Sequence, residues 1–326
     1  MEGTIAGPIC PRCFAAPGSS TRCAGCGLEF ELAGNLLDTL GPEERGADAA
    51  RVERFYAKNP FPGYAPADDA GSLLDRSRRS AFLSELDAAI PARARVLDCG
   101  CGTAQLAAFL ALAGPRRTVF GFDGCRESLE LGERFRAATG TSNLQLVRAD
   151  LFGLPITARS FDVVICRGVI HHTPDPDAAV ASVADAVAPG GVLVLGFYES
   201  QARLFHRARR CIAWVTRRPV SLLDPILRRR DVDAEKKRIW IEDQYRHPLE
   251  HIVPLPRVVR VLDELGFEWV RTVPPAPLGQ SMFEATPGAT GASLAMLRFS
   301  WMLRGLRDPD AGLVCYVARR RPGTGS

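Results

Sequence analysis

Three aspartates stand where carboxylate chemistry is possible, because each ends a short apolar segment that is typical of a β-strand. They are Asp98, Asp123 and Asp150. The carboxyl ends of parallel strands meet at one edge of a sheet, and ligands bind there. At that edge Asp123 can accept hydrogen bonds from both hydroxyls of a ribose, and Asp150 can accept one from an adenine amino group. These residue types therefore indicate a site for an adenosine.

The residues around the first aspartate distinguish between adenosine-containing ligands. Gly100 and Gly102 begin a glycine-rich turn, but Gln105 stands where the dinucleotide-binding pattern needs its third glycine. Asp98 would repel a pyrophosphate and attract an ammonium group. The sequence therefore disfavours NAD and favours an adenosine that carries a cationic amino-acid tail and no phosphate.

The segments that must position these aspartates alternate between strand and helix patterns. We expect strands at 95–98, 118–123, 144–150, 161–166 and 191–197, and helices at 105–113, 127–138 and 177–187. Continuous apolar strands that alternate with helices indicate a parallel sheet covered on both faces. The predicted fold class is therefore α/β.

Four of the ten cysteines, Cys10, Cys13, Cys23 and Cys26, form a C-x2-C-x9-C-x2-C pattern. Two such turns supply four thiolates, the ligand set of a tetrahedral zinc. A segment this short has too little apolar core to fold without a metal, which favours zinc over disulfides or incidental thiols. Four protein ligands leave no open position for a catalytic water, so we expect the zinc to be structural.

The composition excludes several classes of protein. The chain has 326 residues, of which 46% are hydrophobic and 24% charged, as in globular domains. This argues against extensive disorder, a fibrous protein and a polytopic membrane protein. No apolar stretch of about 18 residues predicts a spanning helix. The first residues lack the basic start and apolar run of a secretion signal, so we expect a cytoplasmic protein.

Basic residues are concentrated in one segment, 203–238. It holds twelve Lys and Arg against four Asp and Glu, so its net charge is +8. Because the net charge of the whole chain is +4, the remaining residues together carry −4. Three interpretations stay open: a solvated helical face, a surface for nucleic-acid phosphates, or an amphipathic element on an anionic membrane. The apolar helix predicted at 293–306 is expected to pack on the core, with a lid, dimer or apolar-substrate contact as alternatives.

The order of the motifs resembles that of class I S-adenosylmethionine (SAM)-dependent methyltransferases of the small-molecule type. The motifs are Val96–Thr103, Phe122–Asp123, Arg148–Asp150 with Leu154–Pro155, Phe161–Val164 with Val169–His172, and Ala188–Gly191. The resemblance continues through Gly266–Val270 and Leu313–Val317. It implies a Rossmann-like sheet of seven strands with helices on both faces, in which the final strand is inserted antiparallel. One departure is Ala104, where many members have glycine.

The resemblance also implies a set of cofactor-binding residues. The methionine part of SAM would face Asp98, Gly100, Cys101 and Gly102; the ribose would face Asp123 and Gly124; the adenine would face Asp150 and Leu151; and Cys166 and Arg167 would edge the cofactor and the substrate.

Methyl transfer needs an acceptor atom in line with the methyl group, and a hydroxyl, amine or carbon acid also needs a base. His171 or His172 is a candidate base, although such a pair commonly packs the loop in this family. In the lid, His251 and Tyr245 are further candidates. The residues expected to line the acceptor site are Tyr56, Phe61, Tyr64, Tyr198 and His247.

The chain is expected to divide into five parts. They are a zinc-ribbon-like knuckle at 1–35, a linker and cap with an aromatic segment at 36–80, a SAM-binding core at 81–199, a basic helical lid at 200–256, and the last two strands with an inserted apolar helix at 257–326.

Three functions are compatible with these features. The first is methyl transfer from SAM to a small metabolite or natural-product intermediate. The second is methylation of an RNA base, with the zinc ribbon and the basic segment holding RNA, although only Arg12 and Arg22 are basic within residues 1–30. The third is a SAM-binding scaffold that recruits a protein partner and lacks an open acceptor site. A peripheral membrane contact or a lipid-like substrate is compatible with the first function.

Overall fold

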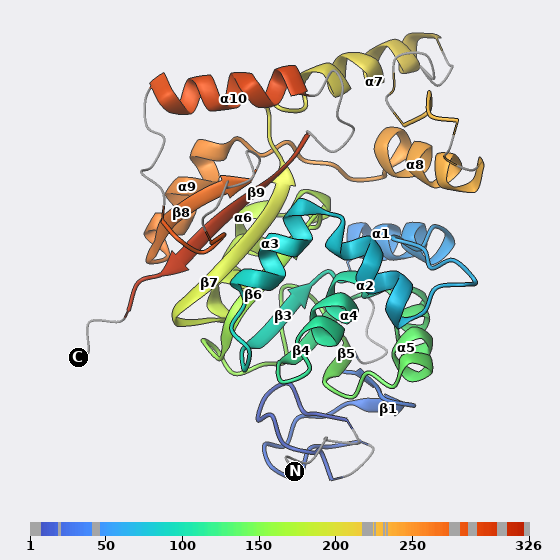
Figure 1. Cartoon of the computed structure of the whole chain (residues 1–326), viewed down its shortest axis with the longest axis vertical. Coiled ribbons are helices and arrows are strands. Elements are labelled where there is room, and N and C mark those ends of the chain that lie inside the picture. The colour runs from blue at the N-terminus through green and yellow to red at the C-terminus, as the bar shows by residue number, and fades with distance from the viewer. Residues whose placement is uncertain are drawn as a thin grey trace.

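A single mixed sheet of nine strands organises the protein (Figure 1). The computed structural model describes residues 8–18, 21–40, 46–216, 224, 226–230, 232, 234–273, 281–285, 292–304 and 312–322. The strand order is β1-β2-β5-β4-β3-β6-β7-β9-β8. The predicted Rossmann-like α/β fold is confirmed.

Seven of these strands form the methyltransferase-type sheet that the motifs implied. They are β3 (Arg95–Cys99), β4 (Thr118–Asp123), β5 (Leu144–Arg148), β6 (Phe161–Arg167), β7 (Val187–Tyr198), β8 (Phe267–Val273) and β9 (Leu313–Arg320). Strands β3 to β7 are parallel, and β9 lies antiparallel between β7 and β8. The carboxyl ends of β3, β4, β6 and β7 therefore meet at one edge of the sheet.

The N-terminal segment extends this sheet, which the sequence did not predict. Strands β1 (Glu31–Ala33) and β2 (Leu36–Asp38) form a hairpin, and β2 pairs parallel with β5. The side chain of Gln145 fastens the segment: it accepts from the Ile9 amide at 2.8 Å and donates to the Asn35 carbonyl at 2.6 Å. The cysteine-rich segment is therefore built onto the edge of the core.

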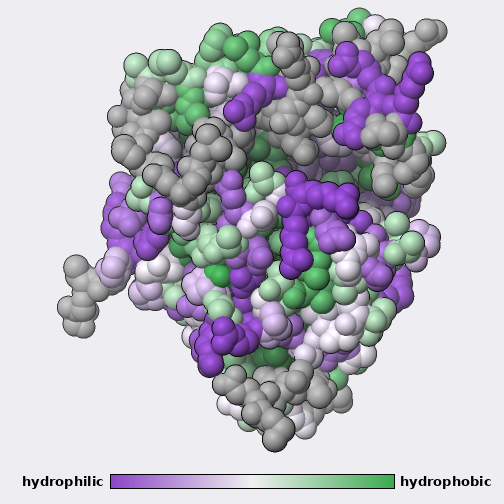
Figure 2. All heavy atoms as spheres, viewed as in Figure 1, coloured by the Kyte–Doolittle hydropathy of each residue, from purple (hydrophilic) through white to green (hydrophobic). Residues whose placement is uncertain are grey.

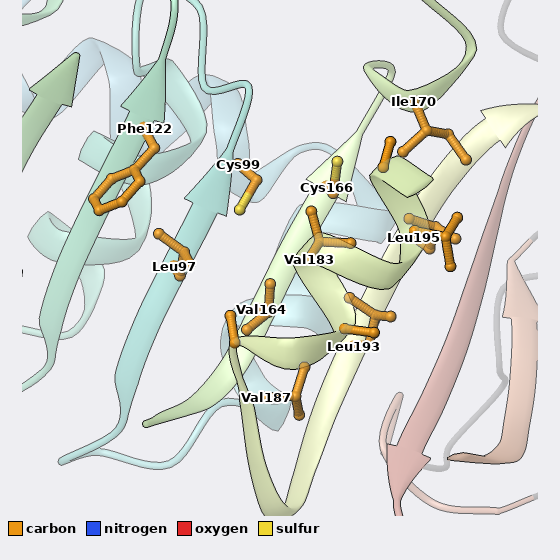
Figure 3. Packing of buried hydrophobic residues seen from close by; sticks show 14 of the residues in the cluster. Leu97, Cys99, Phe122, Val164, Cys166, Ile170, Val183, Val187, Leu193 and Leu195 are labelled. Atoms are coloured by element: carbon orange, nitrogen blue, oxygen red, sulfur yellow. The ribbon is translucent and has the colours of Figure 1, made fainter. Parts of the chain in front are cut away.

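Helices cover both faces of the sheet because successive strand residues point to opposite sides. In β3, Val96 belongs to the core with α3 (Ala81–Ala89), α4 (Gln105–Ala113) and α5 (Arg126–Thr139), whereas Leu97 belongs to the core with α6 (Pro176–Asp185) and α9 (Leu255–Glu264). Figure 3 shows the second core, where side chains of β3, β6 and β7 meet Val183 of α6.

Helix α2 (Ala70–Arg78) joins α3 and α4 on one face, with Leu73 in their core. Four helices lie around the carboxyl edge of the sheet and beyond it (Figure 1): α1 (Ala47–Lys58), α7 (Leu204–Thr216), α8 (Ala234–Arg246) and α10 (Ala292–Arg304). The apolar helix predicted at 293–306 is α10. In the described part of the chain, no helix is long and apolar enough to cross a membrane.

Candidate active site

A cavity of about 450 Å³ opens at the carboxyl ends of β3, β4, β6 and β7. The glycine turn and the ends of β3, β4 and β6 line one part of it, and residues of α1 and α8, with Tyr198 at the end of β7 and Arg203 just before α7, line another. The expected cofactor residues that line it are Asp98, Gly100, Cys101, Gly102, Asp123, Gly124, Asp150, Leu151 and Arg167. Cys166 is fully buried in the core beneath the cavity and does not line it.

Asp98 is the most unusual group in this cavity. Its side chain is 3% exposed, and its Oδ2 has no hydrogen-bond partner among the described residues. Burial, with a smaller contribution from the nearby charge of Asp123, raises the pKa of Asp98 to about 7, and Arg167 partly opposes the shift. The charged form of Asp98 is therefore destabilised in this position, and a cationic ligand would stabilise it.

Asp123 is held in a fixed orientation by the backbone. Its Oδ2 accepts from the Gly102 amide at 2.8 Å, and its Oδ1 accepts from the Cys125 amide at 2.8 Å. Each carboxylate oxygen has a second lone pair, so Asp123 can also accept from two ligand hydroxyls. The Asp123 carboxylate therefore binds the glycine turn and remains able to bind a diol.

The turn after β3 requires glycine at two positions for space as well as for conformation. Gly100 has φ +71°, and a Cβ there would stand 2.3 Å from Cγ2 of Val169. Gly102 has φ +55°, and a Cβ would stand 2.2 Å from the Phe61 carbonyl oxygen. Ala104, the departure from the family pattern, is also in the left-handed region, at φ +63°. The backbone thus passes close to both the Val169 loop and the linker.

The aromatic linker is fastened to this turn. The Phe61 carbonyl accepts from the Thr103 amide at 3.4 Å, and the Gly63 carbonyl accepts from Nε2 of Gln105 at 2.9 Å. Among the aromatic residues expected at the acceptor, Tyr56 and Phe61 line the cavity, but Tyr64 does not. The Tyr64 ring stacks on Phe135 with 4.5 Å between the ring centroids.

The half of the cavity away from the glycine turn is built around Gln244 of α8. Its Nε2 donates to the Tyr198 hydroxyl at 2.8 Å and to Oδ2 of Asp243 at 2.6 Å, and its Oε1 accepts from Nη1 of Arg203 at 2.7 Å. All four residues line the cavity. Burial raises the pKa of Asp243, and the hydrogen bond from Gln244, the charge of Arg203 and a hydrogen bond from Tyr56 partly oppose this.

The two adjacent histidines occupy different environments on a single 3₁₀ turn. His171 is fully buried and does not line the cavity, and its ring packs 3.9 Å from the Tyr198 ring between centroids. His172 lines the cavity, and its Nδ1 lies 2.7 Å from the Leu249 carbonyl oxygen. A carbonyl only accepts, so Nδ1 carries the proton and Nε2 of the neutral ring carries a lone pair. Burial lowers the pKa of His172 to about 4.

The other lid residues expected at the acceptor lie outside the cavity lining. The His247 ring packs 3.6 Å from the His172 ring, and the His251 amide donates to the His171 carbonyl at 2.7 Å. The Tyr245 hydroxyl donates to Oδ2 of Asp224 at 2.7 Å. These three residues therefore contact neighbouring residues of the lid and of the 3₁₀ turn and do not line the cavity themselves.

Among the lining residues that sequence reasoning missed are Arg203, Trp240, Asp243 and Gln244. Trp240, Asp243 and Gln244 have the spacing of one helical face, and that spacing in the lid was the available signal. Arg203 was assigned to the basic segment as a whole. Nothing local in the sequence indicates that it turns inward.

The four N-terminal cysteines converge at the opposite, amino-terminal edge of the sheet (Figure 1). Their sulfur atoms all lie within 4.8 Å of one another. Two sulfur pairs, Cys10 with Cys26 and Cys13 with Cys23, are separated by 3.6 and 3.5 Å. Backbone amides lower the pKa of Cys23 to about 7, although burial opposes this. The geometry suits a tetrahedral metal ion far from the cavity.

Comparisons with known proteins identify a domain that carries most of the expected cofactor residues. A family model described as a methyltransferase domain matches residues 96–191. A ubiquinone biosynthesis O-methyltransferase of Paracidovorax citrulli is 34% identical over 112 residues, which are 34% of this chain and 46% of that protein. A malonyl-[acyl-carrier protein] O-methyltransferase of Methylovorus is 30% identical over 152 residues, which are 45% of this chain and 51% of that protein.

Among solved structures, the magnesium protoporphyrin IX methyltransferase of Synechocystis is 15% identical, with a TM-score of 0.48 over 84% of this chain and 99% of that chain. The chain spans between 27% and 51% of the length of the first curated relatives that it matches. The ordered motifs, the matching family model and the related sequences together show that residues 96–191 of this chain form a methyltransferase domain of the class I SAM-dependent type.

Proposed function

We propose that this protein transfers a methyl group from SAM to a small molecule. The observation that carries the proposal is the buried, unpartnered carboxylate oxygen of Asp98 beside the anchored carboxylate of Asp123. The donor set fits SAM: Asp98 would attract the cationic amino-acid part, and Asp123 would accept from the ribose hydroxyls. When bound, SAM supplies a methyl group on a positively charged sulfur.

The far half of the cavity supplies the groups that an acceptor needs. Gln244 orients Asp243, Tyr198 and Arg203, and His172, whose ring lies 6.0 Å from the Tyr198 ring between centroids, lines the same cavity. Orienting the acceptor in line is worth about 7–11 kcal/mol in such reactions. Asp243 is the base we favour, because its raised pKa makes it a better proton acceptor than an ordinary carboxylate.

We propose a hydroxyl as the acceptor group. Asp243 and Nε2 of His172 both accept protons, and the relatives described above are named as O-methyltransferases. Phe61 of the linker and Trp240 of α8 both line the cavity. Aromatic walls contributed by the linker and the lid suit a small molecule better than an RNA base.

We further propose that the four cysteines hold a structural zinc. Zinc there would hold the turns that precede β1 in one conformation. The contact of Phe14 with Phe120 would anchor these turns to the sheet. No cysteine of the cluster lines the cavity. The metal would therefore act on folding and not on the methyl transfer.

Removal of the diol-binding carboxylate should weaken cofactor binding. We expect Asp123→Ala to lower the affinity for S-adenosylhomocysteine (SAH) about 10- to 100-fold, because two hydrogen bonds to a charged group are lost. Isothermal titration calorimetry measures this. Asp185→Ala, an exposed acid at the far edge of the sheet, is the matched control and should bind like wild type. Unchanged affinity in Asp123→Ala would reject the ribose assignment.

Methyl transfer should depend on Asp243 while cofactor binding does not. We expect Asp243→Asn to reduce transfer of a tritium-labelled methyl group from SAM into a small-molecule extract about 100-fold or more, with SAH affinity unchanged. Asp75→Asn, on the exposed side of α2, is the control. Label that enters RNA in place of small molecules would contradict the proposed substrate class, and equal rates in Asp243→Asn would contradict the proposed base.

Metal analysis should find one zinc per chain. Cys10→Ser should remove it and lower the melting temperature, because the binding energy of a structural zinc is folding energy. Cys211→Ser, which changes an exposed cysteine outside the cluster, should keep both the metal and the melting temperature. A metal-free wild-type protein with an equally stable N-terminal segment would refute the zinc site.

A further inference from the structure

The exposed apolar side chains of this protein gather on two helices. Nine large hydrophobic residues are exposed in the described part of the chain, and two of them line the cavity. The other seven all lie on α7 and α10: Leu204, Ile212, Trp214, Val215, Met296, Phe299 and Leu303. Soluble proteins scatter such residues singly, so a gathered set marks an interaction surface.

On each helix these residues form one stripe. In α7, Leu204, Ile212 and Val215 are spaced to lie on one face, and Trp214 beside them is 83% exposed. In α10, Met296, Phe299 and Leu303 do the same, with Met296 73% exposed. The opposite face of α10 is the one that packs inward, since Trp301 is fully buried. The outer stripes are therefore additional to the faces that hold the helices in place.

A single buried carboxylate ties the two helices together. Oε1 of Glu199 accepts from Nη2 of Arg298 in α10 at 2.8 Å, and its Oε2 accepts from the Gln201 and Ala202 amides just before α7 at 2.7 and 3.0 Å. Glu199 is fully buried. The helices lie at the same end of the molecule, where Figure 2 shows hydrophobic surface over α10. We call this surface, formed by the seven residues above, the α7–α10 face.

The charged residues within the two described helices of the α7–α10 face are all basic. Neither helix contains an acidic residue, and Arg207 and Arg304 are exposed, whereas Arg210 is paired with Glu250 at 2.8 Å. An apolar stripe bordered by arginines matches the interface of an anionic lipid layer, where apolar residues enter the acyl boundary and cations meet the headgroups.

We propose that the α7–α10 face docks on an anionic lipid surface. A second copy of the chain fits less well, because a two-fold contact would place arginines against arginines with no acid on either helix. RNA fits less well too, because the outermost side chains, Trp214, Val215 and Met296, would meet no phosphate. Arg203, one residue before α7, lines the cavity, so the docked face would lie beside the acceptor half.

Vesicle sedimentation tests the proposal. The full-length protein should bind vesicles of phosphatidylcholine with phosphatidylglycerol and not vesicles of phosphatidylcholine alone, and added salt should weaken the binding. Arg207→Gln should bind about fivefold more weakly, whereas Arg116→Gln, at the far end of the molecule, should bind like wild type. The double variant Val215→Ser and Met296→Ser should lose about tenfold or more.

Two further measurements keep the outcome unambiguous. Tryptophan emission should shift to shorter wavelength on binding, and Trp214→Phe should remove the shift. SAH affinity should stay unchanged in every variant, which shows that they fold and separates this proposal from the proposed function. No binding to anionic vesicles overturns the proposal. Self-association that the double serine variant abolishes, without vesicle binding, assigns the face to a second copy.

Discussion

The candidate site depends on one unfavourable placement: the Asp98 carboxyl group is buried, and its Oδ2 has no hydrogen-bond partner among the described residues. Burying Asp98 beside Asp123 costs free energy, and its raised pKa of about 7 records that cost. The pKa of Asp98 in the folded protein is above the ordinary value of 3.8, so protonation of Asp98 stabilises the folded protein at low pH. This contribution to stability is lost as the pH rises through 7. A cationic ligand reverses this penalty, which makes the ligand-free protein less stable than the bound one.

The rest of the fold holds this carboxylate in place and leaves room in front of it. The parallel strands bring Asp98 and Asp123 to one edge, and two glycines let the backbone turn close to Val169 and Phe61. The linker closes the turn from outside, and α8 supplies the opposite wall through Gln244. The sheet thus positions the residues that would bind the cofactor. Segments outside the sheet, the linker and α8, position the residues that would bind the acceptor.

This division explains what the sequence could predict. Asp98, Asp123 and the glycine turn are local to strand ends, so their chemistry and spacing follow from short stretches of sequence. The pairing of β2 with β5 and the inward turn of Arg203 depend on contacts between segments more than 40 residues apart, which no local pattern encodes. His171 and His172 show the same limit: they are neighbours in sequence, but only His172 lines the cavity.

The most direct test is the number of protons released when SAH binds. It is measured by calorimetry in buffers of different ionisation enthalpy. Because the Asp98 pKa is about 7, the ligand-free site is mostly protonated at about pH 6, and a bound ammonium favours the charged form. We predict release of close to one proton there, little release above about pH 8, and none in Asp98→Asn. No release at the lower pH, or the same release in Asp98→Asn, would contradict the central claim.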